Sequence, residues 1–258
     1  MKRFLILLGL ALLAGCGTGY YDELYNQHLK ELQLAAKFIV LWPGPNEIPG
    51  TDLVVRLPKI FERAYNKNST YSDDPNAEID MERLNPPFLN PFPGLINCYE
   101  TYVKDADNQN LPVYLYTGMK ELSAEGKAAF EQEMLGKLKA LNPDANLVDV
   151  QAPTPQGTSV PWKRIDITLP QDFFPQGQGK KGAKRLPGVF ELWFYDTPTG
   201  LIIFGWRATD AIAAQINLPD LANMTAGTLT TKPPEVKPAE PAAADEAPAG
   251  GAPNGAAQ

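Results

Sequence analysis

Two apolar runs, VFELWFY at 189–195 and LIIFGW at 201–206, decide the fold of this 258-residue chain. Between them lies Thr197-Pro198-Thr199-Gly200, in which proline and glycine occupy the positions that a type I turn favours. A connection this short joins antiparallel strands, so the sequence predicts a β-hairpin. Both strands read as buried on both faces, which is unusual in an antiparallel sheet. We therefore expect this hairpin to be the most buried element, with helices on both sides of its sheet.

The segments before this hairpin predict further strands and one long helix. Ile165, Ile167 and Leu169 alternate with polar residues, which indicates a strand with one buried face. Ser123 is suited to cap a helix that runs to about residue 141 and ends at Asn142-Pro143. After the hairpin, 208–228 predicts a helical region with a break near Leu218-Pro219. Strands are predicted at 52–57, 96–103, 111–117, 147–150 and 162–169.

The order of these elements over about 50–230 resembles the PsbP-like α/β/α sandwich. An antiparallel sheet, one long mid-chain helix, a late apolar hairpin and a terminal helix carry the resemblance. It implies a partner-binding role, because members of that fold mostly bind or stabilise other proteins. The Pro- and Asn-rich stretch 62–94 departs from the pattern and is expected to be an irregular excursion. The predicted fold class is α+β, with one globular domain over 46–231.

The first 16 residues have the features of a bacterial export signal. Lys2 and Arg3 precede an apolar run at 4–13, which is too short to span a bilayer at about 20 residues. The following Leu13-Ala14-Gly15-Cys16 resembles the lipobox of bacterial lipoproteins. The resemblance implies cleavage of the signal peptide 1–15, diacylglycerol on Cys16 and acylation of the new N-terminus. We expect an exported protein that is anchored in a membrane through Cys16, because two or more acyl chains hold firmly.

Gly17 bears on which membrane holds the anchor. In lipoproteins of bacteria with two membranes, an aspartate after the lipidated cysteine favours retention in the inner membrane. Gly17 therefore favours the outer membrane if two membranes are present.

An amphipathic tether helix is predicted between this anchor and the domain, within 16–45. Its apolar residues recur at steps of three and four and form one stripe. We expect this stripe to be covered by the domain or by a second copy, which would make a homo-oligomer through 20–40. An imidazole on such a stripe is expected to lie in a core or an interface. The stripe comprises Tyr21, Leu24, Tyr25, His28, Leu32, Ala35, Ala36 and Ile39.

The C-terminal stretch 232–258 is rich in proline, alanine and glycine and has no aromatic residue. It cannot bury enough apolar surface to offset the entropy lost on ordering, so we predict a disordered tail. A spacer or a segment that contacts the cell wall is the alternative to a merely solvated tail.

Composition excludes several functions. The formal net charge is −7, or −9 without Lys2 and Arg3, which argues against nucleic-acid binding. A single histidine leaves little room for histidine-based metal sites or catalytic triads. With Cys16 lipidated, Cys98 has no partner for a disulfide and is predicted to be a buried structural thiol. We predict no cofactor and no metal.

One basic cluster stands out on this acidic chain: Lys180, Lys181, Lys184 and Arg185. It could contact anionic lipid or an acidic protein partner, and the alternative is a solvated loop. The overlapping stretch 177–182 fits G-x-G-x-x-G, but it does not lie between a strand and a helix, as dinucleotide binding requires.

The stretch from Asp105 to Asn110 shares residues with a calcium-binding loop. It has Asn110 and Tyr116 where an EF-hand needs glycine and glutamate. We therefore predict a tight turn between two strands.

No pattern in the sequence identifies a catalytic group. The favoured function is a membrane-anchored envelope lipoprotein with a non-enzymatic, protein-binding or structural role. The alternatives are a hydrolase that uses carboxylates not singled out by any motif, and a lipoprotein that binds a small ligand or lipid. A cleft with convergent carboxylates would favour the hydrolase, and a large apolar cavity would favour the ligand binder. A closed core with an exposed apolar patch would favour protein binding.

Overall fold

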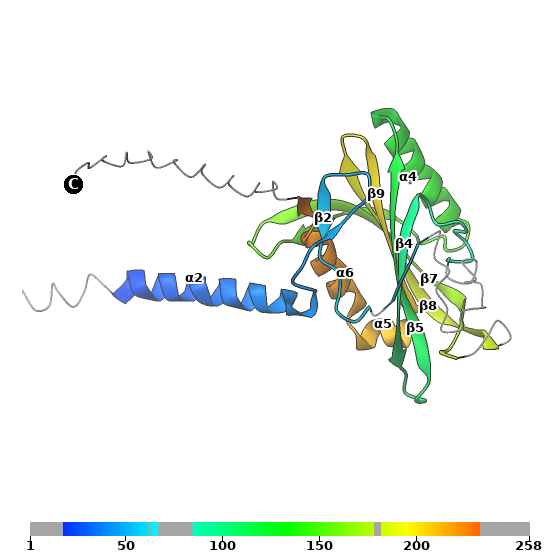
Figure 1. Cartoon of the computed structure of the whole chain (residues 1–258), viewed down its shortest axis with the longest axis horizontal. Helices are drawn as coiled ribbons and strands as arrows, with labels where there is room; N and C mark the ends of the chain where they lie inside the picture. The colour runs from blue at the N-terminus through cyan, green and yellow to red at the C-terminus, as the bar shows by residue number, and fades with distance from the viewer. Residues whose placement is uncertain (1–17, 62, 67–84, 178–181, 233–258) are drawn as a thin grey trace, which may run out of the picture.

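The computed structural model describes residues 18–61, 63–66, 85–177 and 182–232. Its centre is a seven-stranded antiparallel sheet with the order β3-β4-β5-β9-β8-β7-β6 (Figure 1). The strands are β3 (Arg63–Asn66), β4 (Leu95–Lys104), β5 (Asn110–Glu121), β6 (Leu147–Pro153), β7 (Ser159–Phe173), β8 (Lys184–Thr197) and β9 (Gly200–Thr209). A smaller antiparallel sheet has the order β1-β2-β10, formed by β1 (Asn46–Glu47), β2 (Leu53–Val55) and β10 (Thr230–Thr231).

Helices cover both faces of the central sheet (Figure 1). On one side, called the α4 face here, lies α4 (Ala124–Lys139), which packs Phe130, Met134 and Leu138 onto the strands. On the other, the α6 face, lie α5 (Asp210–Gln215), α6 (Leu218–Gly227) and the small sheet. The predicted α+β class and the antiparallel sheet covered by helices are confirmed.

The β8–β9 hairpin is the centre of the core, as its sequence predicts. Every residue of β9 is buried, and Thr197 pairs with Gly200 across the turn. Trp193 and Phe204 face the α6 side, whereas Leu192 and Ile203 face the α4 side. An antiparallel hairpin can be apolar on both faces here because each face is covered.

Local signals fix the ends of the helices. The Ser123 side chain accepts a hydrogen bond from the backbone N–H of Gly126, which caps α4 as expected. Between α5 and α6, Asn217 adopts a left-handed backbone with φ of 50°, and Leu218-Pro219 then begins α6. The predicted break in the C-terminal helical region is therefore confirmed.

Part of the predicted excursion at 62–94 is a strand. β3 pairs with β4, so that Tyr65 lies opposite Cys98. By pairing with β4, β3 covers backbone N–H and C=O groups that would otherwise lie unpaired at the edge of the sheet. This edge exists only in the folded sheet, so the sequence around residue 63 does not reveal it.

Several predicted segments lie outside the described residues. They are the signal peptide 1–15 with Cys16, the stretch 67–84, and the tail from residue 233 onward. None of the helices in the described ranges is long and apolar enough to cross a bilayer.

Candidate interaction surface

α2 (Thr18–Lys37) projects away from the rest of the molecule (Figure 1). Only its C-terminal end is attached. The following 3-10 turn η1 (Phe38–Val40) buries Phe38 in the core of the α6 face, and Leu34 packs against the same core. The Arg56 guanidinium holds the chain at this junction, because its Nε donates a 2.7 Å hydrogen bond to the carbonyl oxygen of Trp42.

The apolar stripe of α2 is exposed to solvent. Tyr21, Tyr25 and Leu32 are 70%, 67% and 68% exposed, and Leu24 is 40% exposed. Leu29, which lies beside the stripe, is also 40% exposed. The expectation that the domain itself covers this stripe is wrong. The reason is that α5, α6 and the small sheet already fill the α6 face where α2 joins the domain. The other alternative, cover by a second copy, is not tested by this single chain.

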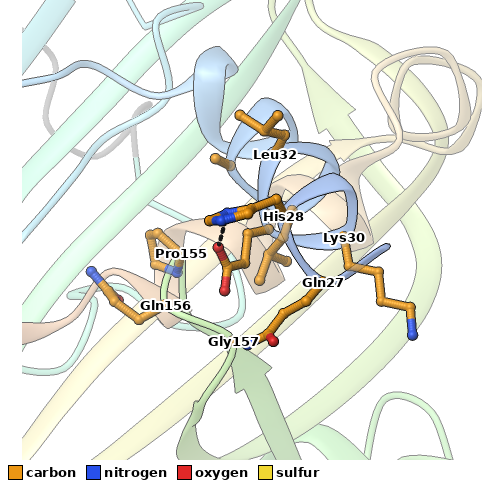
Figure 2. Close-up of a pocket in the computed structure, with 10 residues that line it drawn as sticks. Gln27, His28, Lys30, Leu32, Pro155, Gln156 and Gly157 are labelled. Carbon is orange, nitrogen blue, oxygen red and sulfur yellow. Dashed lines mark ion pairs between the residues drawn. The ribbon is translucent and has the colours of Figure 1, made fainter. Parts of the chain in front are cut away.

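A groove of about 740 Å³ separates α2 from the turn Pro155-Gln156-Gly157 between β6 and β7. Figure 2 shows the turn residues on one side and the helix on the other. Leu32, Leu34 and Ala35 contribute its apolar wall. The groove therefore runs beside the exposed stripe and shares residues with it.

His28 lies on the wall of this groove (Figure 2). Its Nδ1 is 3.3 Å from Oε2 of Glu31, one turn along the helix, and both side chains are more than half exposed. The expectation of a core imidazole is therefore wrong, and a position at an interface stays a prediction.

The basic cluster is only partly described. Lys180 and Lys181 lie outside the described residues. Lys184 and Arg185 begin strand β8, where the Lys184 ammonium donates to Oε1 of Gln109 and Nη1 of Arg185 lies 3.5 Å from Oδ1 of Asp172. Adjacent strand residues point to opposite faces, so these two cations do not form one patch. Arg185 is the more exposed of the two.

Asp105 organises the predicted turn between β4 and β5. Its Oδ1 accepts hydrogen bonds of 2.9 Å from Asp107 N and 2.8 Å from Gln109 N. Asn108 has a left-handed backbone with φ of 61°. The predicted tight turn between two strands is confirmed, because the Asp105 carboxylate accepts hydrogen bonds from the backbone of the turn.

Cys98 is fully buried in β4. Burial raises the pKa of its thiol well above the usual range, and the nearby Glu100 carboxylate raises this pKa further. The protonated thiol is a poor nucleophile, so Cys98 fits the predicted structural role.

A buried polar row that was not predicted from the sequence crosses the sheet. Glu100, Tyr114 and Arg207 are neighbours on β4, β5 and β9. Their side chains are at most 2% exposed. The Arg207 guanidinium lies 4.8 Å from the ring centroid of Phe173 and 5.3 Å from that of Tyr114. The only available signal was a charged residue at the end of the apolar run 201–206.

The row also perturbs the two tyrosines beside Arg207. Burial raises the pKa of Tyr114 and of Tyr116, and the positive charge of Arg207 opposes the rise. Both phenols are therefore neutral. Because the row is closed to solvent, its one carboxylate, Glu100, is not placed to act on a substrate from outside.

A second, more polar groove of about 630 Å³ lies between the β1–β2 turn and the β8–β9 turn. Two hydroxyl groups that line this groove already form hydrogen bonds within these turns. Thr51 Oγ1 donates 2.8 Å to the carbonyl oxygen of Ile48, and Thr197 Oγ1 donates 3.0 Å to that of Gly200. Its carboxylates, Asp52 and Asp196, have no histidine or cysteine beside them among the residues lining this groove.

Within the ranges that the structure describes, no three His, Cys, Asp or Glu side chains gather as a metal site would require.

No known protein family matches this chain, and no curated protein matches it either. Among solved structures, the chain is similar to the cyanobacterial PsbP protein (CyanoP) of Synechocystis sp. PCC 6803. The sequence identity is 7% and the TM-score is 0.35, over 73% of this chain and 91% of that chain. Beyond this weak similarity, the PsbP-like resemblance stays a prediction.

Proposed function

We propose that this protein is a membrane-anchored envelope lipoprotein that binds a protein partner through α2. The observation that carries the proposal is the exposed apolar stripe on a helix that projects from a closed core. Removing apolar surface from water contributes roughly 25 cal/mol per Å², so large side chains such as Tyr25 and Leu32 favour a covered state. Contiguous apolar surface of this kind is typical of interaction sites.

The anchor proposed at Cys16 lies two residues before Thr18, where α2 begins. Lipid on Cys16 would bring the N-terminal end of α2 to the membrane surface. The helix has 20 residues, and at about 1.5 Å per residue it would hold the domain about 30 Å away. Partners in the same membrane would then meet the stripe before they meet the domain. An outer membrane stays the favoured location if two membranes are present.

The alternatives receive less support from the geometry. Among the lining residues, the groove at α2 has one carboxylate, Glu31, and the second groove has Asp52 and Asp196 with no histidine or cysteine beside them. The buried carboxylate Glu100 is closed to solvent. The two grooves are open, and the apolar side chains inside the domain are tightly packed. A closed core beside an exposed stripe is the combination expected of a protein-binding module.

The basic cluster would add a weaker contact. Arg185 is 68% exposed and its 3.5 Å pair with Asp172 lies at the surface. Surface ion pairs of this type contribute about 0–1 kcal/mol, so Arg185 can exchange Asp172 for an anionic lipid or partner at small cost.

Two measurements test the proposal. Mass spectrometry of the mature protein is expected to show an N-terminus at Cys16 that carries acyl chains, and Cys16→Ser should remain uncleaved. An unmodified chain that begins at Met1 would overturn the anchor. Photoreactive benzoylphenylalanine in place of Leu32 should then give protein adducts in native membranes. The same residue in place of Gln33 should give none, and equal adducts or no adducts would overturn α2 as the binding surface.

A further inference from the structure

The exposed stripe of α2 has the spacing of a coiled coil. Tyr21, Tyr25, His28, Leu32 and Ala35, called the heptad seam here, follow one another at steps of 4, 3, 4 and 3. This alternation gives a seven-residue repeat, and such a repeat lets two helices wind around each other in a left-handed supercoil. In the heptad, the a positions are Tyr25 and Leu32, and the d positions are Tyr21, His28 and Ala35. A helix that packs on its own domain needs no such strict repeat.

The residues that flank the seam fit a parallel pair. Leu24 occupies a g position and Leu29 an e position. In a parallel coiled coil, a g residue of one helix meets the e residue five positions later on the other. Leu24 would therefore cover Leu29 of the second helix, which accounts for the two leucines that are each 40% exposed in the single chain.

Charges raise no obstacle to this pairing. Glu31, the charged g residue, meets Ala36 of the second helix at the following e position. This g–e pair therefore brings no like charges together in the parallel register.

The outer face of α2 is polar, as a two-stranded coiled coil requires. One exception, Leu34, is the residue that attaches α2 to the domain. Between Asp22 and Lys37, the other b, c and f positions are occupied by Glu23, Asn26, Gln27, Lys30, Gln33 and Lys37.

We propose that the partner of α2 is a second copy of this chain, and that the two helices form a parallel, in-register coiled coil along the heptad seam. This inference rests on the proposed function, which places both N-termini at one membrane surface and so aligns the helices in parallel. The seam is self-complementary, because each residue meets its own counterpart in this register. Leu32 and Ala35 of the seam also line the groove beside the turn 155–157.

The area available suits a dimer of modest strength. A tyrosine buries about 150–250 Å² when it is fully covered, and Tyr21 and Tyr25 are about two-thirds exposed in the single chain. With the three exposed leucines of α2, the pair would remove on the order of 1,000 Å² from water, close to the lower limit for a specific interface. Confinement to one membrane surface raises the effective concentration and favours the pair further.

His28 sets the register of the pair. It places two imidazoles at one d layer between apolar layers, and a polar residue at a single seam position specifies register at a cost in stability. His28→Leu should therefore strengthen association, by about ten-fold or more, because a leucine in that layer adds buried apolar surface.

The test uses the full chain in native membranes. Leu32→Cys is treated with a short thiol-to-thiol crosslinker, and Gln33→Cys, the next residue on the outer face, is the matched control. Cys98 is buried, so its thiol is protected from the crosslinker while the domain is folded. We expect a product of twice the chain mass from Leu32→Cys alone, and its yield should rise when His28→Leu is added.

Each outcome bears on one proposal. Equal dimer yields from the two cysteine variants, or no dimer from Leu32→Cys, would overturn the second copy as partner. If benzoylphenylalanine in place of Leu32 then attaches a different protein, α2 stays the binding surface and the proposed function stands. If it attaches nothing, both the second copy and the proposed function of α2 fail.

Discussion

Arg207 and Gln171 are 36 positions apart, yet Nε of Arg207 donates a 2.9 Å hydrogen bond to Oε1 of Gln171. Both side chains are buried. Nη2 of Arg207 also donates to the backbone oxygen of Asp172. Because β8 lies between β7 and β9, this one guanidinium ties the end of β7 to β9 across an intervening strand.

Arg207→Lys is expected to destabilise the domain. Lysine has no planar fork, so it cannot satisfy Gln171 and the Asp172 carbonyl together while it stacks on Phe173. We expect the free energy of unfolding to fall by about 3–5 kcal/mol, the range for a buried charge that loses a partner. Urea denaturation measures this. Arg185→Lys, which changes an exposed arginine, should alter it by less than about 0.5 kcal/mol. A similar loss in the free energy of unfolding for the two variants would show that the buried hydrogen bonds of Arg207 do not stabilise the domain.

Leu32→Glu should separate association from folding. Leu32 is 68% exposed, so its replacement leaves the domain core untouched. In the proposed dimer, it would place two carboxylates in one seam layer, where like charges repel. We expect a melting temperature within about 2 °C of the parent at low concentration, together with loss of the dimer in sedimentation equilibrium. Gln33→Glu is the control and should keep the dimer. A large fall in melting temperature would mean that α2 packs on the domain after all.

Two glycines should respond in opposite directions to alanine. A Cβ on Gly227, at the end of α6, would lie 1.8 Å from the backbone oxygen of Pro153 in β6. Backbone atoms must then move, and we expect a loss of more than about 2 kcal/mol in the free energy of unfolding. A Cβ on Gly136 in α4 would meet nothing within 4 Å. Gly136→Ala should therefore gain about 0.5–1 kcal/mol from helix propensity. Equal effects in thermal melts would contradict the close contact between α6 and β6.

Glu191→Gln should change how stability depends on pH. Burial raises the pKa of Glu191, and the hydrogen bond from Trp193 Nε1 to its carboxylate opposes the rise. The folded state therefore holds this proton more tightly than the unfolded state. The resulting stabilisation is complete below the unfolded pKa of about 4.3 and is lost as pH rises through the folded pKa.

Glutamine stays neutral and can still accept the hydrogen bond from Trp193. We expect Glu191→Gln to be more stable than the parent at pH 7, by on the order of 1 kcal/mol, and nearly equal to it near pH 4. Urea denaturation at the two pH values checks this, with Glu121→Gln on the exposed end of β5 as control. A variant that is less stable than the parent at pH 7 would mean that the carboxylate is stabilised where it lies.

Local features of the fold could be predicted from the sequence because their causes are local. The β8–β9 hairpin follows from two apolar runs and a Pro-Gly turn, and Ser123 marks the start of α4. The break before α6 follows from Leu218-Pro219. In each case the residues that decide the structure are within a few positions of one another.

Long-range pairing could not be predicted in the same way. β5 lies beside β9, so Tyr114 meets Arg207, which is far along the chain. The buried polar row exists only because of this pairing, and no local sequence pattern predicts the row. The exposure of α2 was missed for a related reason. Its periodicity predicts an apolar stripe, but whether the domain covers that stripe depends on how fully α5, α6 and the small sheet occupy the nearby face.

The position of Cys98 has a practical consequence. Among the residues that the structure describes, it is the only cysteine, and it is sealed inside β4 between β3 and β5. A thiol-reactive dye can reach it only when the sheet opens, so the rate at which Cys98 is labelled would report how often the sheet opens. Comparing this labelling rate with the rate of global unfolding would reveal whether β3 dissociates from β4 first or the whole sheet unfolds in one step.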